Sequence, residues 1–299
     1  MTCGQRMRSE FRLKLFGLTT HNHRNVFTRT PWLSNRLPFL LYRAAVCLYQ
    51  VICNFTIHTA LGEFQPLILI YLTEWAYFLL TLHTVVSAAL CFADYYDSRS
   101  QRGPTSQENL SSDVVMTTGS TTTGGETTQT SVGQDSAQSL QIPWHYKLYW
   151  VLYNVAFSGG IFITIVFWLL LRNDFTEGSI LTHAMNSVTI VMDVMVSGLP
   201  CRLLHFVHIS TAGVVYILFT VVYWAAGGTG LDGQPYIYPF LDYGGNPVLA
   251  AIVAVLAVVV AIPLCHCIVF ALVVARESLI GVVQRRQSDN SQSVDVTAL

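Results

Sequence analysis

One apolar stretch of the chain carries polar side chains at a spacing that could support chemistry. His183, Asn186, Ile190 and Asp193 follow one another at intervals of 3, 4 and 3 residues. At about 100° per residue they share one face of a helix. Hydrogen-bonding and ionisable groups in such a segment are costly and normally face the interior of a helix bundle. We therefore expect this face to point inward, with His183 nearer the outer end.

A threonine in another apolar segment could complete a catalytic pair. Thr73 lies roughly 10 Å along the helix that we expect to begin at Pro66, so it can share the depth of His183. A threonine hydroxyl becomes a nucleophile when a base, usually histidine, takes its proton. Asn186 could orient the histidine or donate to the oxyanion. The alternative is packing, because threonine often bonds its own helix backbone and both residue types join neighbouring helices.

Two further features admit other interpretations. Glu74 and Asp193 inside apolar segments are also compatible with a transporter or channel, whose flux would depend on those acids. Cys265, His266 and Cys267 are ligand types, but three consecutive helical residues point in different directions, which favours packing. No motif predicts a cofactor or a metal ion.

Composition identifies the environment of these residues. The chain has 299 residues, of which 52% are hydrophobic and 11% are charged. Soluble domains carry about 25% charged residues. These values exclude a soluble globular enzyme and a nucleic-acid-binding protein, and they leave membrane lipids as the expected surroundings.

Six apolar blocks are long enough to cross a bilayer, which takes about 20 residues each. Helices are required there, because lipid offers no partners to the backbone. The sequence thus predicts an all-α, polytopic transmembrane bundle. The six predicted spans are 37–57, 66–92, 148–171, 180–197, 203–224 and 248–274.

Lysine and arginine predict the orientation, because they gather in cytosolic loops. Seven precede residue 37, three lie between the second and third spans, one follows the fourth span, and three follow the sixth. Only Arg172 lies on the other side. Both termini should therefore be cytosolic. Arg43 is inside the first span, and we expect it to extend back to the cytosolic interface.

The segments outside the spans differ in composition. Residues 97–142 contain 18 Ser or Thr and no aromatic residue, so we predict a disordered cytosolic loop. The predicted outer loop 225–247 is rich in glycine and tyrosine, which suits either an anchored turn or a cap over a pocket. The predicted organisation is a basic cytosolic segment 1–36, spans one and two at 37–96, the loop 97–142, spans three to six at 143–280, and a disordered tail 281–299.

The C-terminus predicts a protein partner. Thr297, Ala298 and Leu299 fit a PDZ ligand, which adds a strand to a sheet edge.

Several stretches together resemble the rolling stone family of multi-pass membrane proteins. They are FLLYR at 39–43, YLTEW at 71–75, KLYWVLYN at 147–154, HAMNSVTIVMDVMVS at 183–197, YILFTVVYWAAGG at 216–228 and PYIYPFLD at 235–242. The family is named for an insect protein associated with myoblast fusion. The resemblance implies a role in cell–cell fusion or membrane organisation, in the plasma membrane or an endomembrane.

A more distant similarity is to the androgen-induced family, which includes the androgen-dependent TFPI-regulating protein. Its members hydrolyse fatty-acid esters with an intramembrane threonine and a histidine. Tyr71-Leu72-Thr73, His183 with Asp193, and the loop 238–242 are similar to that pattern. This similarity implies Thr73 as nucleophile and His183 as base. The sequence leaves open whether the protein is such an enzyme or a non-enzymatic membrane protein.

Overall fold

The computed structural model describes residues 10–12, 16–18, 25–61, 66–100, 142–171 and 180–297. The fold is all-helical, and every regular element in these ranges is a helix or a helical turn. The main helices are α3 (Leu37–Thr56), α4 (Leu72–Ser100), α6 (Trp144–Val166), α8 (Met185–Val196), α9 (Phe206–Ala225), α10 (Pro247–Leu256) and α11 (Ile262–Thr297). The shorter elements are α2 (Asn25–Thr28), η2 (Ile57–Leu61), η3 (Pro66–Ile70), η4 (Phe167–Leu171), η5 (Ile180–Ala184), η6 (Leu203–His205), η7 (Pro239–Leu241) and η8 (Ala257–Ala261).

Five helical stretches in the described ranges are long and apolar enough to cross a membrane. They are Leu37–Thr59, Leu72–Ser100, Trp144–Leu170, Leu203–Ala225 and Pro247–Asn290. The predicted span 180–197 is the wide turn η5 followed by α8, a shorter apolar helix of 12 residues. The protein is thus an integral membrane protein with several apolar helices, while six crossings and cytosolic termini stay predictions.

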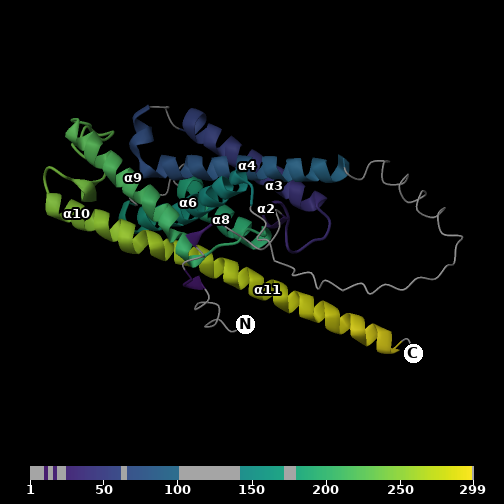
Figure 1. The fold of residues 1–299 in the computed structure, drawn as a ribbon. Coiled ribbons are helices and arrows are strands. Elements are labelled where there is room, and N and C mark those ends of the chain that lie inside the picture. The colour runs from purple at the N-terminus through teal and green to yellow at the C-terminus, as the bar shows by residue number, and fades with distance from the viewer. Residues whose placement is uncertain are drawn as a thin grey trace, which may run out of the picture.

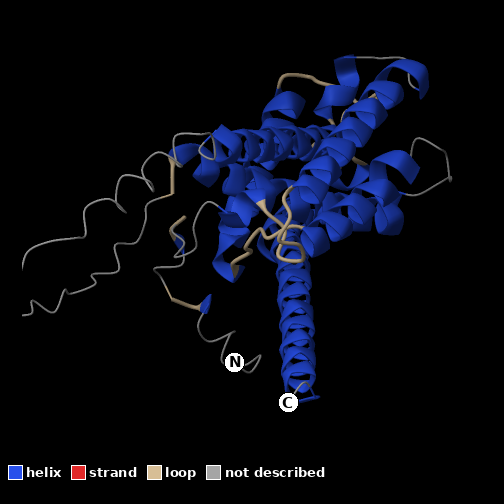
Figure 2. Cartoon of the chain, turned by 90° about the vertical axis from the view of Figure 1, so that its right-hand side faces the viewer, coloured by secondary structure: helices blue, strands red, loops and turns tan. Residues whose placement is uncertain are grey.

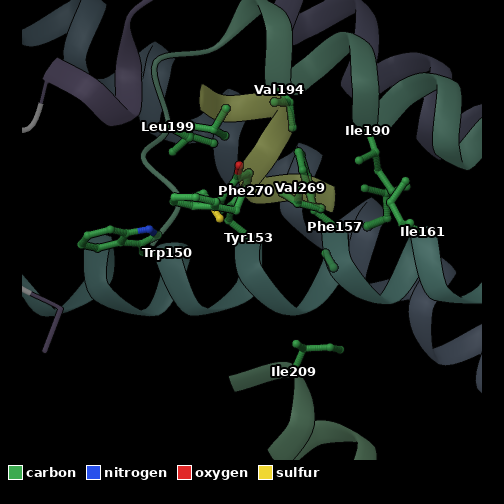
Figure 3. Close-up of a cluster of buried hydrophobic side chains, with 14 of the residues drawn as sticks. Trp150, Tyr153, Phe157, Ile161, Ile190, Val194, Leu199, Ile209, Val269 and Phe270 are labelled. Carbon is green, nitrogen blue, oxygen red and sulfur yellow. The ribbon is translucent and has the colours of Figure 1, made fainter. Parts of the chain in front are cut away.

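Helix α6 forms the centre of the bundle. It packs against α4 on one side and against α8, α9 and α11 on the others (Figure 1). Its residues Trp150, Tyr153 and Phe157 recur at helical spacing and are at most 1% exposed. Figure 3 shows these rings in one cluster with Val269 and Phe270 of α11. Aromatic packing on α6 therefore joins the two sides of the bundle.

The C-terminal end of α8 is held by donors from distant parts of the chain. Arg276 of α11 donates to the backbone carbonyls of Val194, Ser197 and Leu199 at 3.1, 2.7 and 3.1 Å. The Thr30 hydroxyl donates to Val196 O at 2.7 Å, and the Trp32 indole donates to Met195 O at 2.6 Å. The last carbonyls of a helix have no partner within it. These contacts give the terminal carbonyls of α8 hydrogen-bond donors. They also hold in place a helix that is too short to be stable by itself.

Two boundaries differ from those that the sequence predicts. Helix α4 begins at Leu72, because Pro66–Ile70 forms a separate 3₁₀ turn, so Thr73 lies in the first turn of its helix and not deep within it. At the other end of the chain, α11 continues as a helix through Thr297 and projects beyond the bundle (Figure 2). Residues 282–299 contain no glycine or proline, so nothing in the predicted tail 281–299 after Gly281 stops that helix. Residues 101–141 of the predicted loop, and Ala298 and Leu299 of the predicted PDZ ligand, lie outside the described residues.

Candidate membrane cavity

An apolar cavity of about 400 Å³ lies among α4, α6, α9, α10 and α11. Aliphatic and aromatic side chains form nearly all of its wall, and three hydroxyl groups gather where α4 begins. The lining residues include Leu72, Thr73, Phe162, Val166, Phe167, Tyr216, Ile217, Tyr238, Phe240, Val253, Ala254 and Ile262. Its volume falls in the usual range of ligand-binding pockets. The cavity lies at the end of the bundle that we predict to face outward.

Two wide helical turns contribute to the cavity wall. The π turn η4 supplies Phe167 and Leu170, and the π turn η8 supplies Ala257, Val258 and Val260. Pro263 follows η8, and a proline removes a backbone donor and clashes with the carbonyl four residues before it. A widened turn relieves that clash. Single π turns inside helices occur often at functional sites, and here both face the same space.

Hydroxyl groups are fixed at the polar end of the cavity. The Leu72 backbone N–H donates to the Tyr238 hydroxyl at 3.1 Å, and the Tyr216 hydroxyl donates to the Ile70 carbonyl at 2.8 Å. The Thr73 side chain interacts with the same Tyr238 hydroxyl. Burial raises the pKa of Tyr238 to about 12, so its phenol is neutral at physiological pH. This end can therefore donate hydrogen bonds to an ester or carbonyl oxygen without carrying a charge.

The predicted outer loop forms part of the cavity wall. Tyr238, Phe240 and Leu241 from this loop line the cavity, and Ile237, Tyr238 and Leu241 are each no more than 8% exposed. Ring contacts join Tyr238 to Tyr71 at 5.6 Å. Of the two interpretations of the loop, this arrangement favours a cap over a pocket, because side chains of the loop form part of the cavity wall.

The structure does not bring Thr73 and His183 into contact. Thr73 lines the cavity, whereas His183 lies behind Phe167, whose ring stacks flat on the imidazole with centroids 3.5 Å apart. In the part of the chain that the structure describes, Nδ1 of His183 is buried and has no hydrogen-bond partner. The Thr164 hydroxyl donates to the His183 carbonyl at 2.6 Å and holds this turn against α6. Phe167 therefore separates the two predicted catalytic side chains.

The predicted inward face of the fourth apolar segment is confirmed. His183, Asn186, Ile190 and Asp193 are 6%, 2%, 0% and 2% exposed. Asn186 lies three residues after His183, at the start of α8. Asp193 lies near the other end of α8 and does not line the cavity. One end of this face thus packs against the cavity wall through His183, and the other end contacts α3 through Asp193.

Asp193 forms a buried ion pair with Arg43 of α3. The Arg43 guanidinium donates to Asp193 Oδ1, which also accepts from the Tyr42 hydroxyl at 3.2 Å. Arg43 is 1% exposed, so the expectation that it extends to the cytosolic interface is wrong. Burying a lone charge is costly, and a partner charge of opposite sign offsets part of that cost. The Arg43 guanidinium also lies 4.9 Å from the centre of the Phe39 ring.

Glu74 has a different partner at the other end of the bundle. His58 Nε2 lies 3.2 Å from Glu74 Oε2, and the His58 ring stacks on Phe78. Neither Glu74 nor Asp193 lines the cavity, and each contacts its own partner on α3 or η2. The two acids therefore belong to separate contacts, and the transporter interpretation stays a prediction.

Sequence reasoning missed a second hydroxyl–histidine pair. Ser158 Oγ lies 2.9 Å from His266 Nδ1, and His266 Nε2 lies 2.9 Å from the Arg202 carbonyl. Because a carbonyl only accepts, Nε2 carries the hydrogen and Ser158 donates to Nδ1. Both side chains are 0% exposed and neither lines the cavity. The pair joins α6 to α11, which agrees with the packing interpretation of His266. The two residues lie 108 positions apart, so no local sequence pattern could predict their contact.

Comparison with known proteins identifies the family. The family described as "Protein rolling stone" matches residues 112–279, more than half of the chain. The chain belongs to the rolling stone family. "Protein rolling stone" from Drosophila melanogaster is 29% identical over 239 residues, covering 76% of this chain and 74% of that protein. No solved structure matches.

The range that matches the rolling stone family includes some of the candidate site residues and leaves out others. The matched range contains His183, Asn186, Tyr216 and Tyr238, together with most of the cavity wall. Thr73 and Arg43 precede it. The similarity to ester hydrolases thus rests on Thr73, which precedes the matched range, and on His183, which lies within it. Hydrolase activity stays a prediction.

Proposed function

We propose that this rolling stone family protein organises membrane lipid by holding a lipid chain in its apolar cavity. The observation that carries the proposal is the cavity itself, about 400 Å³ of apolar space lined by candidate membrane spans. A lipid chain gains little free energy by leaving one apolar medium for another. Selectivity therefore comes from the hydroxyl groups of Thr73 and Tyr238, which suit an ester or carboxyl oxygen.

Such an activity fits the role that the sequence similarity implies. A protein that holds a lipid chain beside a capping loop can alter how lipids pack at the outer leaflet, which is a requirement of cell–cell fusion. The predicted PDZ ligand at Thr297, Ala298 and Leu299 would connect this function to a cytosolic scaffold once the end of α11, which includes Thr297, unwinds to form a strand.

A cavity-filling substitution tests lipid binding. Ala254 lines the cavity and is 9% exposed, so Ala254→Phe should fill part of the space. Ala251 lies one turn earlier on α10 and is exposed, so Ala251→Phe is the matched control. The assay is photocrosslinking of a lipid with a diazirine in its acyl chain, followed by peptide mapping. We expect cavity peptides to be labelled in wild type and in Ala251→Phe, and labelling to fall severalfold in Ala254→Phe. Equal labelling in all three proteins would contradict the proposal.

A second candidate function is hydrolysis of a fatty-acid ester. The specific observation in its favour is that Thr73 lies on the cavity wall beside Tyr238. In this reaction Thr73 Oγ1 attacks the ester carbonyl as His183 takes its proton. The alcohol leaves with that proton, and water then hydrolyses the acyl-threonine. The Phe167 ring must first turn aside to let His183 reach Thr73, with Asn186 available to orient the histidine.

Labelling with a fluorophosphonate separates this candidate from lipid holding alone. We expect the folded wild-type protein to be labelled, and Thr73→Ala and His183→Ala to lose the label. Ser158→Ala is the control, because Ser158 is the donor in the buried pair with His266. Label that persists in Thr73→Ala but disappears in Ser158→Ala would reject Thr73 as nucleophile. No label on a folded wild type would leave the lipid-holding function without an enzymatic step.

A further inference from the structure

A polar hollow of about 430 Å³ lies at the opposite end of the bundle from the apolar cavity. Its lining combines two guanidinium groups, three hydroxyl groups and one amide. The residues are Ser34, Asn35, Arg36, Tyr95, Ser98 and Arg99. Neither the cavity residues nor the predicted catalytic residues belong to it.

The position of the hollow follows from the helices that form it. Arg36 directly precedes α3, and Ser98 and Arg99 lie in the last turn of α4, which packs antiparallel to α3. These helix ends flank the first two candidate spans, where the excess of arginine predicts the cytosolic face. The hollow should thus lie at the depth of the inner-leaflet headgroups.

The charges in the hollow do not cancel. Asp94 lies between Arg29 and Arg36, with its Oδ2 atom 3.8 Å from Arg29 Nε and 3.5 Å from Arg36 Nη1. Arg36 Nη1 also donates to the Ser98 hydroxyl, which holds the guanidinium over the hollow. Among the described residues, Arg99 is exposed and forms no ion pair. Asp94 thus contacts two guanidinium groups and Arg99 adds a third cation, so the charge stays positive even when Asp97 near Arg99 is counted.

This combination of donors is typical of a site for phosphate. Guanidinium groups bind phosphate oxygens through paired N–H donors, and hydroxyl and amide groups complete such sites. We propose that the hollow binds a phosphate group, carried by an anionic phospholipid of the inner leaflet or by a soluble phosphate ester. Its depth favours the phospholipid. The proposal is independent of the apolar cavity, because no residue lines both.

Retention of a phosphate-bearing lipid provides the test. The full chain is placed in nanodiscs of phosphatidylcholine containing phosphatidic acid, and retained lipid is counted by native mass spectrometry. Losing one charged hydrogen-bond donor should reduce retention about tenfold in Arg99→Gln. Arg99 is exposed, so the variant should fold normally. Arg285→Gln is the control, because it makes the same charge change on the exposed part of α11.

A second arm identifies the source of the phosphate group. The same proteins in nanodiscs of phosphatidylcholine alone are titrated with glycerol 3-phosphate and with inorganic phosphate. Binding in this arm that Arg99→Gln removes assigns a soluble ester, and binding only in the first arm assigns the phospholipid. Equal retention by wild type and Arg99→Gln would overturn the proposal. Equal loss in Arg285→Gln would also overturn it, because that result would indicate a nonspecific effect of charge.

Discussion

The two ends of the helix bundle treat polar groups in opposite ways. At the end where α8 terminates, Arg43 contacts Asp193, and Arg276 donates to three backbone carbonyls. At the end where α4 begins, the hydroxyl groups of Thr73 and Tyr238 face a cavity walled by carbon. At the first end the polar groups join helices. At the second end His58 also contacts Glu74, but uncharged hydroxyl groups lie beside open space.

The difference between charges and hydroxyl groups explains this division. A buried ionised group without a partner destabilises a protein strongly, so each charge must meet another group. A hydroxyl group costs much less and can turn to a nearby carbonyl, as Tyr216 does with Ile70. The hydroxyl-lined end can therefore leave its polar groups beside open apolar space without a large loss of stability.

Breaking the buried ion pair should have the largest effect. Asp193→Ala leaves the Arg43 guanidinium buried without its carboxylate, which should cost about 3–5 kcal/mol in the free energy of unfolding. Thermal unfolding in detergent, with size-exclusion chromatography as the readout, measures the loss. The double variant Arg43→Met with Asp193→Leu should recover most of it, because no lone charge remains. A stable, monodisperse Asp193→Ala protein would show that the pair does not hold α3 to α8.

Crowding the contact between α6 and α8 should have an intermediate effect. A Cβ atom on Gly160 would clash with the Cδ1 atom of Ile190, a fully buried side chain. Gly160→Ala should therefore cost about 1–3 kcal/mol through overpacking. Adding Ile190→Val removes the clashing methyl group, so the double variant should be more stable than Gly160→Ala alone. If the second substitution destabilises further, the close approach at Gly160 does not set this interface.

Removing a hydroxyl group from the cavity should have the smallest effect on stability. Thr73 lies at the start of α4 and faces open space, so Thr73→Ala should change the free energy of unfolding by less than about 1 kcal/mol. The same thermal measurement tests this. A loss as large as that of Asp193→Ala would place Thr73 among the groups that hold the fold. Lipid crosslinking, by contrast, should change in Thr73→Ala while stability does not.

Local sequence patterns predicted much of this arrangement. The spacing of His183, Asn186, Ile190 and Asp193 predicted one buried face, because helical periodicity depends on the chain alone. Apolar blocks predicted six spans, and five of them are helical stretches long and apolar enough to cross a membrane in the described residues. Local patterns did not predict structure that depends on contacts with a neighbouring helix. Pro66–Ile70 is apolar enough to extend α4, yet it forms a separate 3₁₀ turn whose Ile70 carbonyl accepts from Tyr216.

The candidate site was predicted only in part. The sequence singled out Thr73 and His183 as hydrogen-bonding groups in apolar segments, and it gave the loop 225–247 as either a turn or a cap. It could not give the ring of Phe167 between the two residues, because a phenylalanine in an apolar block carries no sign of what it stacks on. It also could not give the contact of Ser158 with His266, which lie 108 residues apart.

The sequence by itself determined that this protein is a helical integral membrane protein, because composition and the length of apolar blocks depend on residue types alone. Only the tertiary structure decided which polar groups meet. Arg43 pairs with Asp193 across 150 residues, and Thr73 faces a cavity built from five helices. A charged or hydroxyl group in an apolar segment needs a hydrogen-bonding or ionic partner, or must face a cavity. Which of these it meets depends on the helices packed around it.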